Sequence, residues 1–253
     1  MPHPEALTPR DIEAIATGLL RLSQQIDRSG RPEDIADVLT PIVDRHDGAI
    51  RRLTQIFEAI GDTCNDFILQ DPYAEDLQGI SDEASDTLRA LGNHVNGLDE
   101  QFRTFSSDVT RTPSGQRPPA AAESTAPPLA AKDSIPEPVA DALTPDRVRL
   151  ATRTLADLAA YLRTGPSLAD TLPLLVSVLH ETDGIPVVLG DILRASARIV
   201  TEQATLPLSE ESRQAVGAFR EAAQDVTDWH VLHWDVQRLY DQFSARPADT
   251  PGP

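Results

Sequence analysis

The sequence of 253 residues contains little that would build a reactive site. It has one cysteine, Cys64, which excludes an internal disulfide and indicates a reducing compartment, so we expect a cytoplasmic protein. It has no Gly-x-Gly-x-x-Gly or Gly-Lys-Ser/Thr motif that would cradle a phosphate. It also lacks the His-Glu-x-x-His and Glu-x-x-His patterns of zinc and di-iron helices. We therefore expect no enzymatic activity, no metal and no cofactor.

Long apolar runs and aromatic residues are scarce as well. No stretch approaches the roughly 18 apolar residues that a transmembrane helix needs, so we expect no membrane insertion. Aromatic residues make up only 4% of the chain, so the core must consist mainly of Leu, Ile, Val and Ala. These side chains suit the packing of helices against one another.

Positive charge is also limited. Bases are almost all arginine, since Lys132 is the only lysine, and the net charge is −18. Residues 1–106 carry −11, residues 107–141 carry −2 and residues 142–253 carry −5. An acidic surface repels phosphate backbones and anionic lipids, which argues against nucleic-acid binding. A basic protein partner, or solubility alone, is the better interpretation.

The most informative feature that is present is an internal repeat. Residues 6–60 align with residues 142–196 at a constant offset of 136 without a gap, with 13 identities in 55 positions. The identities include an Ala-Leu-Thr-Pro segment and an Asp-Gly pair in each copy. Self-similarity of this kind indicates a duplicated structural unit.

Apolar residues recur at three-and-four spacing in both copies, which predicts helices with one buried face. Thr8-Pro9 and Thr144-Pro145 predict the starts of the first helices. The shared Asp47-Gly48 pair predicts a tight turn in which the aspartate caps the third helix and the glycine adopts unusual dihedrals. Cys64 lies on the inward stripe of that helix, so we expect a buried, unreactive thiol.

The fourth helices depart from the constant offset. They are expected at Ser81–Phe105 and, as one longer helix, from Ser209 to about Ala245. The acidic pair Asp82-Glu83 would then lie in a first turn, where carboxylates favour the helix dipole. Since no segment alternates like a strand, the sequence predicts an all-α fold, a tandem duplication of a roughly 100-residue four-helix bundle.

The domain organisation follows from composition. We expect a first helical repeat at 1–106, a disordered Pro/Ala-rich linker at 107–141, a second repeat at 142–245 with an extended last helix, and a flexible tail at 246–253. The linker contains seven prolines, which remove backbone donors and oppose helix formation.

The final helix carries the candidate binding residues. The chain has only two tryptophans, and both lie there, near a histidine pair and a tyrosine: the candidates are Trp229, His230, Trp234 and Tyr240. Trp and Tyr dominate binding hot spots because they bury a large area at low entropic cost. Trp234 points away from the apolar stripe, so its face binds a partner or docks against the other half. His230 and His233 share a face and resemble half of a metal site, but a packed histidine is the simpler interpretation.

Two functional hypotheses remain. The first is a non-enzymatic acidic scaffold or adaptor that binds protein partners, or a second copy of itself, through its helix faces. The alternative is a regulatory bundle that holds a small apolar ligand between its helices. An enclosed apolar cavity beside His233 or Tyr161 would favour the alternative.

Overall fold

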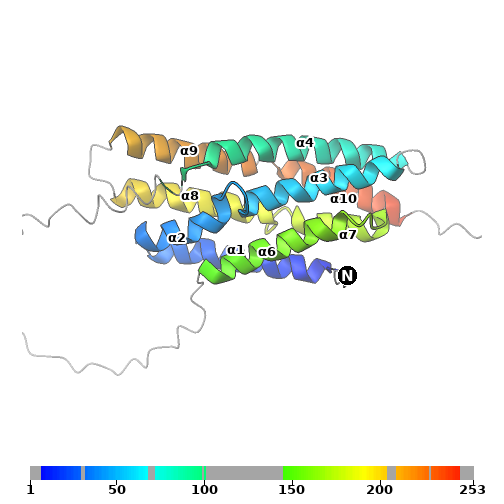
Figure 1. Ribbon diagram of the computed structural model, residues 1–253, viewed down its shortest axis with the longest axis horizontal. Coiled ribbons are helices and arrows are strands. Elements are labelled where there is room, and N and C mark those ends of the chain that lie inside the picture. Colours follow the sequence, from blue (N-terminus) through cyan, green and yellow to red (C-terminus); the bar gives the residue numbers. More distant parts are fainter. Residues whose placement is uncertain are drawn as a thin grey trace, which may run out of the picture.

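The computed structural model describes residues 7–29, 32–67, 72–98, 100, 145–203, 209–227 and 229–245. Within these ranges the chain is helical and holds no strand, which confirms the all-α class (Figure 1). The helices in chain order are α1 (Pro9–Ser29), α2 (Pro32–Val43), α3 (Ala49–Phe67), α4 (Pro72–Val95), α6 (Pro145–Leu162), α7 (Leu168–Val178), α8 (Ile185–Gln203), α9 (Glu210–Thr227) and α10 (His230–Ser244). The expected linker and tail lie outside the described residues.

The first helices begin where the Thr-Pro pattern predicts. In α1, a carboxylate oxygen of Asp11 accepts hydrogen bonds from the backbone N–H of Thr8 at 2.8 Å and from its hydroxyl at 2.6 Å. The hydroxyl bond, followed by the backbone bond, lowers the pKa of Asp11 below its ordinary value. This arrangement supports the helix terminus, where four N–H groups have no partner inside the helix. The corresponding helix α6 begins at Pro145.

The apolar stripes of these two helices are buried as predicted. The buried residues are Ile12, Ile15, Leu19, Leu22 and Ile26 in α1, and Val148, Leu155, Leu158 and Leu162 in α6. Aliphatic side chains dominate the core, and Phe57 and Phe219 are its largest fully buried members. The scarcity of aromatic residues therefore translates directly into an aliphatic helical core.

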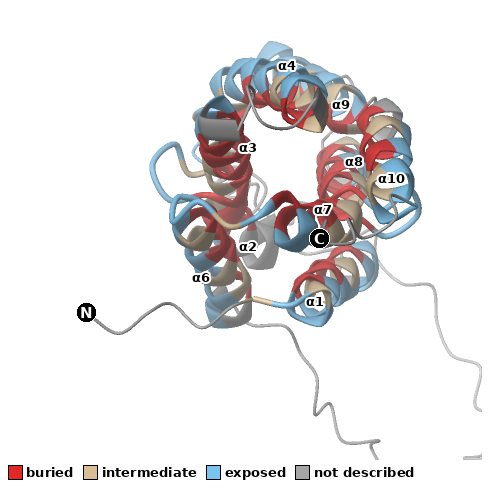
Figure 2. Ribbon diagram, turned by 90° about the vertical axis from the view of Figure 1, so that its right-hand side faces the viewer, coloured by how far each residue is buried: buried red, intermediate tan, exposed pale blue. Residues whose placement is uncertain are grey.

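The helices of the two halves interleave. Helix α1 packs along α8 and α7, and α6 packs along α3 and α2, so each first helix lies against the other half. Within each half, α3 packs on α4 and α8 on α9, while α4 and α9 contact each other. Viewed end-on, the helices surround one shared interior (Figure 2). The structure therefore does not confirm two separate four-helix bundles.

Two buried threonines join the halves by hydrogen bonds. The Thr63 hydroxyl in α3 donates to the carbonyl of Leu162 at the end of α6, at 3.0 Å. The Thr152 hydroxyl in α6 donates to the carbonyl of Pro41 in α2, at 3.3 Å. Both hydroxyls also lie within hydrogen-bonding distance of a carbonyl one turn earlier in their own helices. Each hydroxyl carries a single hydrogen, so its hydrogen bond is shared between a carbonyl of its own helix and a carbonyl of the other half.

The Asp-Gly turns form, but for different reasons than those predicted. A Cβ at Gly48 would collide with the backbone of Asp44 and Ile42, so close approach, rather than a positive φ, requires the glycine. The carboxylate of Asp44 accepts from the backbone N–H of Asp47 at 2.7 Å and thereby holds the turn. Asp47 itself pairs with Arg52 in α3. The prediction that Asp47 caps the helix is therefore wrong.

The fourth helices also differ from the prediction. Helix α4 begins at Pro72 and ends at Val95, followed by Gly97 at a φ of 83° in the left-handed region. The single long helix predicted from Ser209 to Ala245 is instead two helices that meet at Trp229. There, the Trp229 N–H bonds the carbonyl three residues earlier, and the Trp229 carbonyl accepts from Leu232 N–H, so the i to i−4 ladder is interrupted.

Candidate functional site

The predicted partner-binding residues whose side chains are described occupy different environments. Trp229 is only 4% exposed, and its ring meets Phe57 of α3 edge-to-face with centroids 5.6 Å apart. Tyr240 is partly buried against the core. His230 begins α10, and its side chain lies outside the described part of the structure. Trp229 is therefore a core residue that joins the two halves, whereas Trp234 faces solvent.

Trp234 is 58% exposed, which is unusual for so large an apolar side chain. Its ring contacts His233 edge-to-face at 5.3 Å, and His233 in turn contacts His180 at 5.9 Å. His180 forms an ion-pair contact with Asp183 in the turn before α8. The exposed indole is therefore backed by a packed aromatic contact, which limits the entropy that it loses on binding.

His233 lies behind this ring and is only 6% exposed. Neither its Nδ1 atom nor the buried Nε1 atom of Trp229 has a hydrogen-bond partner in the described part of the chain. Among the described residues, no group of three or more His, Cys, Asp or Glu side chains could hold a metal ion. His233 packs edge-to-face against His180 and Trp234.

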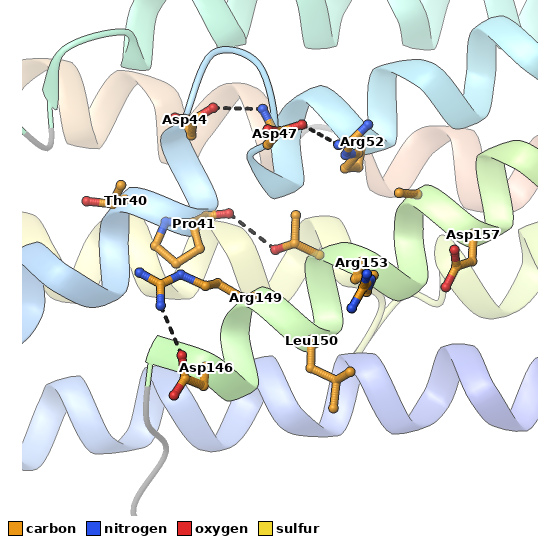
Figure 3. A pocket seen from close by; sticks show the side chains of 12 residues that line it. Thr40, Pro41, Asp44, Asp47, Arg52, Asp146, Arg149, Leu150, Arg153 and Asp157 are labelled. Carbon is orange, nitrogen blue, oxygen red and sulfur yellow. Dashed lines mark hydrogen bonds and ion pairs between the residues drawn. The ribbon is translucent and has the colours of Figure 1, made fainter.

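A second surface feature is a groove of about 680 Å³ between α2 and α6 (Figure 3). Both signs of charge line it: Asp44, Asp47, Asp146 and Asp157 with Arg52, Arg149 and Arg153. Asp146 pairs with Arg149 at 2.9 Å, and the Thr152 hydroxyl reaches across its floor to Pro41. With charges largely matched inside the groove, it has no strong preference for either a cation or an anion.

Leu150 stands between this groove and a neighbouring one of about 360 Å³ between α1 and α6. It is 62% exposed, and the second groove is lined mostly by small or apolar residues such as Ala14, Ile15 and Gly18. Sequence reasoning missed this surface. The sequence did hold one signal for it: Leu150 lies on the outer face of α6, away from the buried stripe, and polar residues are expected on an outer face.

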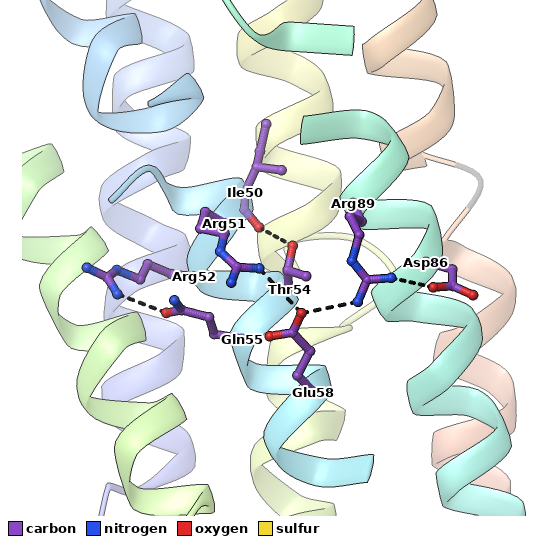
Figure 4. Close-up of polar contacts among 8 residues, drawn as sticks. All are labelled: Ile50, Arg51, Arg52, Thr54, Gln55, Glu58, Asp86 and Arg89. Atoms are coloured by element: carbon purple, nitrogen blue, oxygen red, sulfur yellow. Dashed lines mark hydrogen bonds and ion pairs between the residues drawn. The ribbon is translucent and has the colours of Figure 1, made fainter. Parts of the chain in front are cut away.

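A third feature is a polar network over the seam between α3 and α4 (Figure 4). Glu58 of α3 accepts from Arg51 at 3.3 Å and from Arg89 of α4 at 3.2 Å. The other arm of the Arg89 guanidinium bonds Asp86 at 2.5 Å, and these two carboxylates raise the pKa of Arg89. One guanidinium thus joins two carboxylates on neighbouring helices.

Cys64 is buried in α3, as predicted, with 1% exposure. Burial, together with the nearby carboxylate of Asp82, raises the pKa of the thiol to about 12. The thiolate needed for nucleophilic attack is therefore scarce near neutral pH.

Comparisons with protein-family models, curated proteins and solved structures yield no match to this chain. In the described residues, no helix is long and apolar enough to span a membrane. Function must therefore be inferred from the surface features themselves.

Proposed function

We propose that this chain is a non-enzymatic acidic scaffold or adaptor that binds a protein partner through α10, with Trp234 as the central contact. The observation that carries the proposal is the exposed indole held against His233. Rigid exposed tryptophans are the side chains most enriched in binding hot spots. The net charge of −18 favours a basic partner.

The interleaved halves support a scaffold role because they hold distant surfaces in one packed unit. We further propose that the two halves derive from one duplicated helical unit, as their aligned Thr-Pro and Asp-Gly segments suggest, and that the protein acts in the cytoplasm. The partner can be another protein or a second copy of this chain.

The apolar-ligand alternative has weaker support. The five grooves described in this chain are open to solvent, and neither His233 nor Tyr161 lines any of them. Small-ligand sites bury most of the ligand surface, which open grooves do not. These grooves are better suited to part of a macromolecule.

The test is affinity capture with the full chain, with Trp234→Ala, and with Gln242→Ala as an exposed control on the same helix. Trp234→Ala is expected to weaken partner binding about 30-fold or more, corresponding to a hot spot of about 2 kcal/mol. Circular dichroism should show unchanged helicity because the ring is largely exposed.

Size-exclusion chromatography of the same three proteins identifies whether the partner is a second copy. The proposal fails if Trp234→Ala retains every interaction of the unaltered chain. It also fails if this substitution unfolds α10, since Trp234 would then serve the fold.

A further inference from the structure

The seam between α3 and α4 is strongly acidic. A groove of about 340 Å³ follows it, lined by Glu58, Asp62, Asp82 and Asp86, with Arg89 as the one cation among the described residues that line it. The sequence-based expectation that Asp82 lies in a first turn is wrong, because α4 begins at Pro72 and Asp82 lies well inside it. A role at the helix dipole therefore does not account for this carboxylate.

At one end, the groove already binds a guanidinium. Arg89 bonds Glu58 of α3 at 3.2 Å and Asp86 of α4 at 2.5 Å, so it bridges the two helices. The bridge shows that carboxylates on facing positions of this seam can share the planar fork of an arginine.

One turn further along, carboxylates of both helices line the groove again. Gln78 bonds Asn65 and Arg89 bonds Glu58, so residue numbers rise on α3 as they fall on α4, and the helices are antiparallel. Asp62 lies four residues after Glu58, and Asp82 lies four residues before Asp86.

This second pair therefore faces the groove at the next turn of both helices. A Cβ at Gly61 would lie 3.4 Å from a carboxylate oxygen of Asp82, so Asp82 reaches over α3. Neither Asp62 nor Asp82 has a hydrogen bond or ion pair with any described residue.

The hydroxyl of Ser85 gives independent evidence for a ligand. Ser85 is 5% exposed and lines the groove, yet its Oγ atom has no hydrogen-bond partner among the described residues. Buried hydroxyls are normally satisfied, because leaving one unpaired costs free energy. Because the Oγ atom is shielded from solvent, rotation of the Ser85 side chain toward the groove brings it to a donor that enters there.

The equivalent seam in the other half has the opposite charge. The groove between α8 and α9 has a volume of about 590 Å³. The residues of α8 that line it include Arg194, Arg198 and Thr201, which have the same i, i+4, i+7 spacing as Glu58, Asp62 and Asn65 on α3. Arg194, Arg198 and Arg220 stand where the first seam has Glu58, Asp62 and Asp82. The acidic groove is therefore not a general consequence of helix packing in this fold, and the second seam serves as an internal comparison.

We propose that the α3–α4 groove binds the guanidinium of an arginine side chain from a protein partner, between Asp62 and Asp82, with the Ser85 hydroxyl accepting a further hydrogen bond. This inference rests on the proposed scaffold function and specifies the chemistry of its partner. The five donors of a guanidinium match two carboxylates and a hydroxyl, as Arg89 does with its two carboxylates one turn away. No group of three or more His, Cys, Asp or Glu side chains in the described ranges could hold a metal ion, which disfavours that occupant.

The experiment is isothermal titration of the full chain with a tetra-arginine peptide, with spermine and with MgCl₂ in separate arms. The peptide is expected to bind at least about tenfold more tightly than spermine or Mg²⁺, since only a guanidinium bonds bidentately. Asp62→Asn with Asp82→Asn should weaken peptide binding at least about tenfold.

Two matched variants separate a built site from diffuse charge. Asp76→Asn with Glu83→Gln removes two exposed carboxylates of α4 outside the groove and should change the affinity less than about twofold. Ser85→Ala should weaken peptide binding about threefold or more without lowering the melting temperature, because its hydroxyl makes no bond within the described chain.

Equal losses in the groove and control pairs would overturn the proposal, as would unchanged binding by Ser85→Ala. Absent peptide binding, or spermine or Mg²⁺ binding as tight as that of the peptide, would overturn it too. Trp234→Ala separates this inference from the proposed function. If it abolishes partner capture while the Asp62 and Asp82 variants bind peptide normally, the groove inference alone fails. If the Asp62 and Asp82 variants lose peptide binding while Trp234→Ala leaves partner capture unchanged, the proposal for the α10 surface alone fails.

Discussion

The interleaved packing predicts that neither half of this protein folds alone. The perturbation is expression of residues 1–106 and 142–253 as separate chains. In the intact protein, the helices packed along α1 are α8, α7 and α6, all from the second half. Isolation of the first half would therefore expose the buried stripe of α1.

The size of the effect follows from that stripe. Five of its side chains, Ile12, Ile15, Leu19, Leu22 and Ile26, are at most 5% exposed. At about 1.5–3 kcal/mol for each buried side chain, about 7–15 kcal/mol of burial is lost. A domain of this kind has a total stability of about 5–15 kcal/mol, so the loss is large enough to abolish the fold.

The assay is chemical denaturation followed by circular dichroism, for each fragment alone and for an equimolar mixture. Each fragment alone should have reduced helicity and no cooperative transition as a monomer, and mixing should restore both. The intact chain, cut by limited proteolysis between Pro113 and Pro138, should yield fragments that stay associated. Cooperative unfolding of monomeric residues 1–106, with full helicity, would refute the interleaved arrangement.

Three further predictions concern single residues. Phe57→Ala should lower the free energy of unfolding by about 3–5 kcal/mol, measured by urea denaturation. A double-mutant cycle with Trp229→Ala should give a coupling energy of about 0.5–1.5 kcal/mol, and a value near zero would contradict the edge-to-face contact between the halves. Cys64 should react with thiol reagents at pH 8 only when the chain unfolds, and rapid labelling of the folded chain would contradict its burial. Because folding raises the pKa of this thiol from 9.0 to about 12, its contribution to the free energy of unfolding should fall as the pH rises above 9. Asp27→Asn removes an ion pair with Arg198 in which the two charged atoms are 2.6 Å apart. Because both side chains are about half exposed, the free energy of unfolding should fall by less than about 1 kcal/mol in thermal unfolding, and a larger decrease would contradict this expectation.

The sequence could predict which face of each helix is buried, but not which helix covers it. The stripe of Leu19 and Leu22 and that of Leu155 and Leu158 are buried as predicted. Hydrophobic periodicity does not distinguish packing within one copy from packing across copies, because both bury the same face. The hydrogen bond from Thr63 to the carbonyl of Leu162 depends on that choice, so it had no signal in either segment.

The candidate site shows the same division. The position of Trp234 outside the apolar stripe correctly predicted that its side chain is exposed. The helix break at Trp229 was not predicted, because the apolar stripe continues on both sides of it. The carboxylates of the α3–α4 groove come from two helices, and which of them face one another depends on how α3 and α4 pack. The predicted start of α4 at Ser81 placed Asp82 in a first turn and so concealed that Asp62 and Asp82 line one groove.

The two proposed surfaces belong to different halves but to one packed unit. Helix α10 packs against α4, and Trp229 at its start contacts Phe57 of α3. The acidic groove and the exposed Trp234 are therefore held together by core contacts rather than by a linker. A partner that engages both needs no rearrangement of the scaffold, so it avoids the entropy cost of ordering a flexible tether. The two surfaces share no direct contact among the interactions described above. The losses of binding free energy caused by a substitution in each surface should therefore add when the substitutions are combined, and strong non-additivity would show that one surface acts through the other.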